Sequence, residues 1–177
     1  MPEFKKDVEE FTNILERCSK GELKEEDLQK FLKERTWLFG VEYRNAKPKK
    51  LAGSTSVFDF LLENYAGQGV IVELKLPTEE IFKEKYVLTS KVSDAMGQLI
   101  RYIETTLGIA YSSEMSKIEG ITEKRPLGYV IIGRTKNDDE REDLKRVNSY
   151  YHRIEVLTYD DLLLKAKTTL ESFLKET

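Results

Sequence analysis

Cysteine and histidine are nearly absent from this chain of 177 residues, which has one of each, Cys18 and His152. A single cysteine cannot form an internal disulfide, and one distant Cys/His pair excludes a zinc cluster built from these residues. Any catalytic chemistry must therefore use carboxylates, lysines or hydroxyls. Runs of about 20 apolar residues, which membrane-spanning helices need, are also missing, and the first residues alternate charges with single hydrophobic residues, unlike a signal peptide. We expect a cytoplasmic protein that does not enter a membrane.

Charge of one sign is not in excess, since 29 basic residues face 32 acidic ones. A net charge of −3 argues against a passive polyanion binder. The basic residues are nevertheless clustered, because residues 35–50 hold five of them and one acid, a local net charge of +4. We predict that the candidate phosphate-facing residues are Arg44, Lys47, Lys49, Lys50 and Arg134. Ordinary solvated loops are the alternative, and for Arg134 an ion pair with Asp138 or Asp139.

Hydrophobic periodicity predicts one α/β domain. Apolar residues recur at steps of three and four in five segments, which indicates helices over residues 3–19, 24–35, 91–106, 138–151 and 159–174. Thr158 is expected to cap the last of these. Strands are predicted over residues 41–46, 56–63, 69–76, 127–133 and 153–157, and residues 78–90 and 112–126 are polar and irregular. This order predicts a mixed sheet covered by helices.

Two of these strands, 56–63 and 69–76, flank a short turn centred on Ala66 and predict an antiparallel hairpin. In that register Asp59 lies opposite Glu73, and the alternation of side chains puts Lys75 on the same face. Opposed residues have Cβ atoms about 5 Å apart, so two carboxylates repel unless a cation lies between them. Mg²⁺ takes one or two carboxylates together with waters and phosphate oxygens. Asp59 and Glu73 are therefore candidate metal ligands.

The chemistry that such a set permits is metal-assisted phosphodiester hydrolysis, in which Lys75 acts either as base or as electrostatic stabiliser. Gln98 is a candidate for holding a metal-bound water, and it shares a helix face with Tyr102. Glu34 offers a further carboxylate. The alternatives are an exposed polar position for Gln98 and a solvated helix charge for Glu34. Glu-x-Lys on a strand is also common without any function.

The residues Asp59, Glu73-Leu74-Lys75 and Gln98 to Tyr102 resemble the motifs of the PD-(D/E)XK nuclease superfamily. The Gln-x-x-x-Tyr element is similar to that of the RecB-like branch. Further segments, residues 37–40, 59–62, 72–77, 130–134 and 154–162, together resemble the nuclease domain of the Shedu anti-phage defence family. The likeness covers about residues 25–170. Phe58 stands where the superfamily name has proline.

The resemblance implies a restriction-endonuclease-like fold and a DNA endonuclease that requires Mg²⁺ or Mn²⁺ and acts in anti-phage defence. It implies that Asp59 and Glu73 bind the metal and that Lys75 and Gln98 are catalytic. Tyr102 and Glu34 are candidate accessory residues. Residues 23–177 would form the nuclease domain, and residues 1–22 a helix for an oligomer or regulatory contact.

The expected partners are DNA, taken as double-stranded, and further copies of the chain in a homo-oligomer. No aromatic-rich ribbon for single strands is visible, so contacts through phosphates are expected. The alternative is a catalytically silent nuclease-like domain that binds nucleic acid or assembles.

Overall fold

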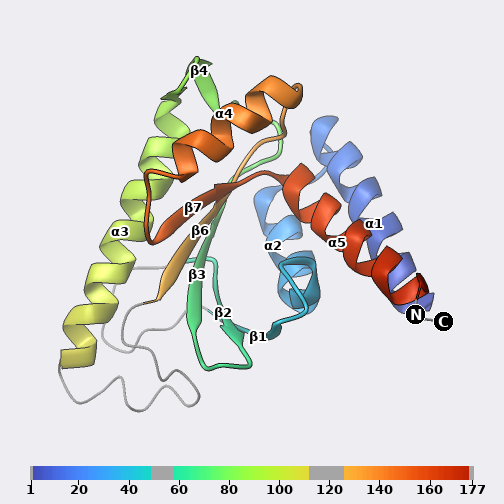
Figure 1. Ribbon diagram of the computed structural model, residues 1–177, viewed down its shortest axis with the longest axis horizontal. Helices are drawn as coiled ribbons and strands as arrows, with labels where there is room; N and C mark the ends of the chain where they lie inside the picture. Colours follow the sequence, from blue (N-terminus) through green and yellow to red (C-terminus); the bar gives the residue numbers. More distant parts are fainter. Residues whose placement is uncertain (1, 49–57, 112–125, 176–177) are drawn as a thin grey trace.

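A five-stranded mixed sheet forms the centre of the protein (Figure 1). The structure, a computed structural model, describes residues 2–48, 58–111 and 126–175. The strands, in their order across the sheet, are β1 (Tyr43–Pro48), β2 (Phe60–Asn64), β3 (Gly69–Leu74), β6 (Leu127–Ile131) and β7 (Ile154–Leu157). The first three pair antiparallel, whereas β6 and β7 run parallel to β3. This arrangement confirms the predicted α/β class.

Five α-helices and one 3₁₀ helix accompany the sheet in the described residues. They are α1 (Pro2–Ser19), α2 (Glu25–Glu34), η1 (Thr36–Leu38), α3 (Ser90–Tyr111), α4 (Asp138–Asn148) and α5 (Tyr159–Lys175). The predicted cap of α5 is confirmed, because the Thr158 hydroxyl accepts a hydrogen bond from the Asp161 amide at 3.1 Å. None of the helices in these residues is both long and apolar enough to cross a bilayer.

The predicted element boundaries differ from the structure at several elements. Helix α3 continues to Tyr111 instead of ending at residue 106, and α4 ends at Asn148 instead of residue 151. Residues 78–90 were expected to be irregular, but they contain a hairpin of β4 (Phe82–Glu84) and β5 (Val87–Leu88). The strand predicted over 41–46 begins two residues later, because η1 and a turn occupy the chain before Tyr43. Residues 56–57 of the next predicted strand and residues 112–125 of the predicted loop lie outside the described residues.

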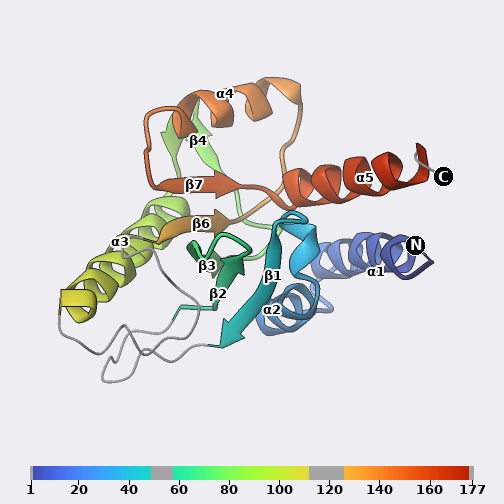
Figure 2. The same cartoon turned by 60° about the horizontal axis from the view of Figure 1, so that its bottom comes forward.

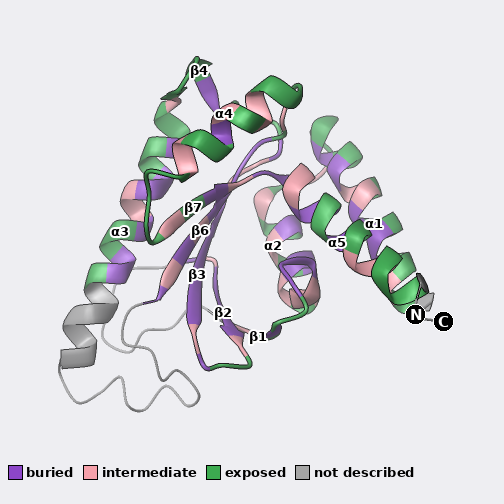
Figure 3. Cartoon of the chain, viewed as in Figure 1, coloured by how far each residue is buried: buried purple, intermediate pink, exposed green. Residues whose placement is uncertain are grey.

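Helices cover both faces of the sheet, so its central strands are buried (Figure 3). On one face, α1, α2, η1 and α5 enclose a core that includes Phe11, Phe31, Phe60 and Tyr159. On the other face, α3, α4 and the β4–β5 hairpin enclose a second core. Strand β3 contributes alternate residues to the two cores, and all its residues are buried, as is typical of a strand covered on both sides.

A buried carboxylate ties α1 to the end of α2. Asp7 accepts a hydrogen bond from Nε of Arg35 at 2.8 Å and another from the indole of Trp37 at 3.0 Å. The apolar face of α1 packs into the first core through residues such as Phe11 and Leu15. The oligomer or regulatory contact expected of residues 1–22, and the domain division at residue 22, stay predictions.

We expect Asp7→Ala to lower the free energy of unfolding by about 3 kcal/mol, because it leaves the Arg35 guanidinium and the Trp37 N–H without their buried acceptor. Urea unfolding monitored by circular dichroism measures this. The matched control is Glu9→Ala on the exposed face of the same helix, with an expected change within about 0.5 kcal/mol. Equal effects of the two substitutions would contradict the structural role of Asp7.

Candidate active site

The antiparallel hairpin of β2 and β3 forms in the predicted register. Phe60 pairs with Val72, so Asp59, the residue before β2, lies opposite Glu73. The amide of Asp59 donates a hydrogen bond to the carbonyl of Val72 at 3.2 Å, which extends the pairing beyond the strand. The predicted register is confirmed for residues 60–63 and 69–72, and the facing of Asp59 and Glu73 follows from extending it by one pair.

A buried ion pair occupies the end of β3. Nζ of Lys75 lies 2.7 Å from Oε1 of Glu73, and Glu73 is only 5% exposed. The backbone of Lys75 is fixed on both sides: its amide donates to the carbonyl of Ile131 at 2.8 Å, and the hydroxyl of Tyr159 donates to its carbonyl at 2.7 Å. The position of the ammonium is therefore set by the main chain and by the carboxylate together.

Asp59 is held by the backbone of β3 and by α2. Its Oδ2 atom accepts a hydrogen bond from the amide of Leu74 at 2.7 Å. Nε2 of Gln29 donates to Oδ1 of Asp59 at 3.1 Å and to the Asp59 carbonyl at 2.8 Å. Both carboxylate oxygens thus have a protein donor, which fixes the orientation of the side chain relative to Glu73.

Two residues of α2, Glu25 and Gln29, belong to this cluster, and the sequence alone did not single them out. Burial raises the pKa of Glu25, the positive charge of Lys75 lowers it in part, and the negative charge of Asp59 raises it further. Glu25 and Gln29 are one helical turn apart on the same face of the helix. The sequence offered one signal for this pair: two polar residues four positions apart lie on the helix beside the apolar Leu28, which is buried.

The ion pair itself has perturbed pKa values. Burial raises the pKa of Glu73, and the hydrogen bond from Lys75 offsets this only in part. Burial lowers the pKa of Lys75, but the hydrogen bond and charge of Glu73, with the charges of Glu25 and Asp59, outweigh burial and raise it overall. Lys75 is therefore a charged ammonium at neutral pH.

Helix α3 brings Tyr102 and Gln98 to the face of the sheet that carries Glu73. Burial raises the pKa of Tyr102, and the negative charges of Glu73 and Asp59 raise it further. The Tyr102 ring packs edge to face on Phe58, with centroids 6.0 Å apart. One turn earlier, Oε1 of Gln98 is buried and has no hydrogen-bond partner within the described residues. Such an oxygen carries a desolvation cost that a bound cation or water would remove.

Glu34 does not join the cluster. It lies at the opposite end of α2, nine residues after Glu25, which corresponds to about 13 Å along the helix axis. Its carboxylate is exposed and lies 3.6 Å from the guanidinium of Arg35. The accessory role predicted for Glu34 is not supported by this position.

The predicted phosphate-facing arginines are engaged by carboxylates. Arg44 forms an ion pair with Glu63, which is 1% exposed on β2. Arg134 pairs with Asp160 at 2.6 Å instead of with an acid of α4. The predicted lysines fall elsewhere: Lys47 in β1, and Lys49 and Lys50 outside the described residues. A role of these basic residues in DNA binding stays a prediction.

The donor set of the cluster consists of oxygens, with one ammonium beside them. No three Asp, Glu, His or Cys side chains come together to bind one ion in the part of the chain that the structure describes. An ion here would therefore take Asp59 and Glu73 and complete its shell with waters or phosphate oxygens. Two carboxylates with water suit Mg²⁺, which keeps several waters when it binds to proteins.

The family model for the C-terminal part of the Shedu protein SduA matches residues 22–163. The chain belongs to this Shedu family. The Shedu match includes every residue of the cluster, from Glu25 on α2 to Tyr102 on α3, and leaves out all of α1. Membership of the Shedu family suggests a role in anti-phage defence. No match was found among curated proteins.

We expect Gln29→Ala to lower the free energy of unfolding by about 1–2 kcal/mol through the loss of its hydrogen bonds to Asp59. At pH 8, Gln29→Glu should lower the free energy of unfolding by more than Gln29→Ala does, because it places another carboxylate against Asp59. This excess over Gln29→Ala should disappear near pH 4 as the carboxylates protonate. Urea unfolding of both variants in chelator measures this. Lys30→Ala on the exposed side of α2 is the control, and an excess that does not change with pH would contradict the charge argument.

Proposed function

We propose that this chain is a divalent-metal-dependent DNA endonuclease of the PD-(D/E)XK type that acts in anti-phage defence. The observation that carries the proposal is that Asp59 and Glu73 lie at the same end of the hairpin, near enough for their charges to act on each other, with the Lys75 ammonium 2.7 Å from Glu73. The proposal includes double-stranded DNA as substrate and a homo-oligomer as the working form.

The residues of the cluster fit Mg²⁺ or Mn²⁺. Asp59 and Glu73 would hold the ion, and the buried, unpartnered Oε1 of Gln98 supplies an acceptor for a water in its shell. The bound ion would supply Lewis acidity and neutralise charge on the phosphoryl oxygens. The raised pKa of Glu73 supports this assignment, because a buried carboxylate gains most from a nearby cation.

Lys75 acts as an electrostatic stabiliser in this proposal. In the protein without metal, the hydrogen bond and charge of Glu73 raise the pKa of Lys75, which favours the charged ammonium. A fixed positive charge in a half-buried site stabilises the negative charge that develops on the phosphoryl group in the transition state. The hydrogen bond from Tyr159 to the Lys75 carbonyl keeps this charge in place.

Gln29 positions the Asp59 side chain, and Glu25 adds negative charge to the site. Gln29 orients Asp59 through its two hydrogen bonds. The raised pKa of Glu25 reflects burial and the nearby charge of Asp59, so its carboxylate adds to the negative field that attracts a cation. The N-terminal half of α2 thereby belongs to the proposed active site.

We expect Lys75→Ala and Glu73→Gln each to lower the rate of DNA cleavage in Mg²⁺ by at least about 100-fold, because each removes a charge that acts on the reacting phosphate or its metal. Supercoiled plasmid and linear duplex are the substrates, and an identical reaction with chelator gives the background. Lys167→Ala, on the exposed face of α5, should cleave at the wild-type rate.

Cleavage that survives Lys75→Ala in a folded protein would falsify the proposed role of this residue. Binding of duplex DNA without cleavage under either metal would favour the alternative of a catalytically silent nuclease-like domain.

We expect Mg²⁺ or Mn²⁺ to raise the melting temperature in the absence of DNA by roughly 5–10 °C at 100 times the dissociation constant. The shift should disappear in Glu73→Gln and persist in Glu16→Gln, an exposed acid of α1. Differential scanning fluorimetry with an equal ionic strength of potassium chloride measures it. A shift of equal size in Glu73→Gln would place the ion elsewhere.

A further inference from the structure

Exposed tyrosines gather at a corner of the molecule away from the acid cluster. Tyr86 comes from the β4–β5 hairpin, and Tyr150 and Tyr151 follow the end of α4. Tyr150 is 83% exposed and Tyr151 42%. Figure 2 shows strand β4 beside α4, and a hydrogen bond joins Arg146 of α4 to Tyr86 of the hairpin, so two segments far apart in the sequence meet here. We call Tyr86, Arg146, Tyr150 and Tyr151 the tyrosine corner.

Contacts between the β4–β5 hairpin and α4 hold the residues of the tyrosine corner in place. Tyr86 has a left-handed backbone conformation with φ of 64°, which is uncommon for a residue with a side chain. Its hydroxyl accepts a hydrogen bond from Arg146 of α4 at 2.8 Å, so the hairpin is fixed to the helix. The ammonium of Lys85 lies 5.2 Å from the centre of the Tyr86 ring. The Tyr86 ring is therefore held beside two cationic side chains, those of Arg146 and Lys85.

Two cavities open at the corner. The larger, about 630 Å³, is lined by the four residues of the tyrosine corner with Val147 and Ser149. The smaller, about 320 Å³, shares Ser149 and Tyr151 with it and continues past His152. Together they form a concave surface with aromatic walls, of a size that accommodates planar ring systems.

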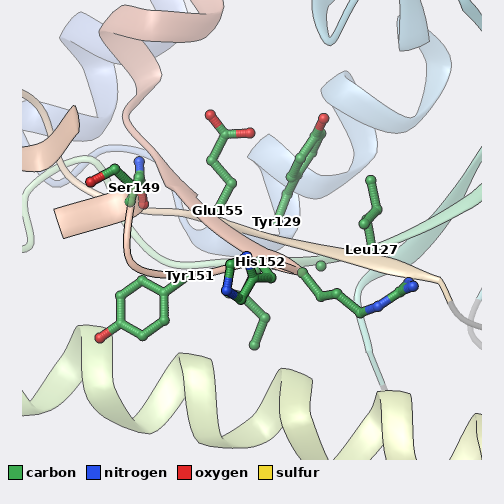
Figure 4. A pocket seen from close by; sticks show the side chains of 10 residues that line it. Leu127, Tyr129, Ser149, Tyr151, His152 and Glu155 are labelled. Carbon is green, nitrogen blue, oxygen red and sulfur yellow. The ribbon is translucent and has the colours of Figure 1, made fainter. Parts of the chain in front are cut away.

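The lining of the larger cavity carries a positive charge, although Asp143 and Glu142 of α4 lie near Arg146. The lining of the larger cavity includes Arg146 and no carboxylate. The smaller cavity has one acid, Glu155, but Figure 4 shows Glu155 and Tyr129 on one side of the strands and Tyr151 and His152 on the other, toward α3. On α4, the nearby Glu142 is neutralised by Lys145 at 2.7 Å. A polyanion with planar groups matches this combination.

We propose that the tyrosine corner binds single-stranded nucleic acid, with bases stacked on Tyr150 and Tyr151 and phosphates bound by Arg146 and Lys85. Exposed aromatic rings beside cations are the pattern by which proteins hold unpaired bases without reading their sequence. The inference goes beyond the proposed function, because the corner lies at the β7 edge of the sheet and takes no part in the acid cluster. DNA and RNA strands share the chemistry that it recognises.

The test is fluorescence anisotropy of the full chain in chelator with labelled 12-nucleotide oligo(dT), oligo(U) and a blunt DNA duplex. We expect the double variant Tyr150→Ala/Tyr151→Ala to weaken single-strand binding by roughly 30-fold, since each stacked base contributes at least about 1 kcal/mol. The double variant with phenylalanine at both positions keeps the ring faces and should bind within about 3-fold of wild type. Arg146→Gln should lower the slope of log K against log salt by about 0.7.

The matched control is Tyr65→Ala, because Tyr65 is 72% exposed at the β2–β3 turn, away from the corner. Its single-strand affinity should equal that of wild type. Loss of affinity confined to the alanine double variant supports the proposal, and the dT and U arms tell which strand is preferred. Absence of single-strand binding by wild type, or equal losses in the alanine, phenylalanine and Tyr65 variants, overturns it.

A changed mass of the alanine double variant in light scattering, with unchanged oligonucleotide binding, also overturns it and assigns the corner to a subunit contact. The cleavage assay separates this proposal from the proposed function. Tyrosine-corner variants should still cut duplex DNA in Mg²⁺, so failure of single-strand binding leaves the acid cluster and its nuclease role intact.

Discussion

The structure depends on how three carboxylates are held next to one ammonium. Asp59, Glu73 and Glu25 would repel one another, and burial makes the repulsion stronger than it would be in water. Lys75 compensates part of this charge, and the rigid register of the hairpin prevents the acids from moving apart. A buried charged set of this kind is weak evidence for stability. The apolar cores on the two faces of the sheet offset the free energy that burying these charges costs.

Helix α2 makes the cluster specific. The hairpin alone would bring two acids and a lysine together, as a strand pair in many proteins could. Gln29 turns the Asp59 carboxylate, while Glu25 adds charge from outside the sheet. Function and packing therefore use the same helix, because Leu28 and Leu32 of α2 are fully buried in the core.

The part of the site that could be predicted from the sequence was the part governed by local rules. A short turn fixes the strand register, so Asp59 and Glu73 followed from the position of Ala66. The contributions of Glu25 and Gln29 depend on where α2 packs, which no local pattern states. Arg44 and Arg134 looked like phosphate ligands because their partners, Glu63 and Asp160, are distant in sequence. The tyrosine corner was invisible for the same reason, since its residues come from two separate segments.

Helix α2 is also a mechanical link between two charged clusters. Gln29, in its second turn, contacts Asp59 of the hairpin, and the residue after its last turn, Arg35, is bound by Asp7 of α1. A ten-residue helix is about 15 Å long and behaves as a rigid rod. Displacing α1 must therefore either break the Asp7–Arg35 pair or pull α2 along with it. A movement of the N-terminal helix, which lies outside the family match, would therefore change the orientation of Asp59.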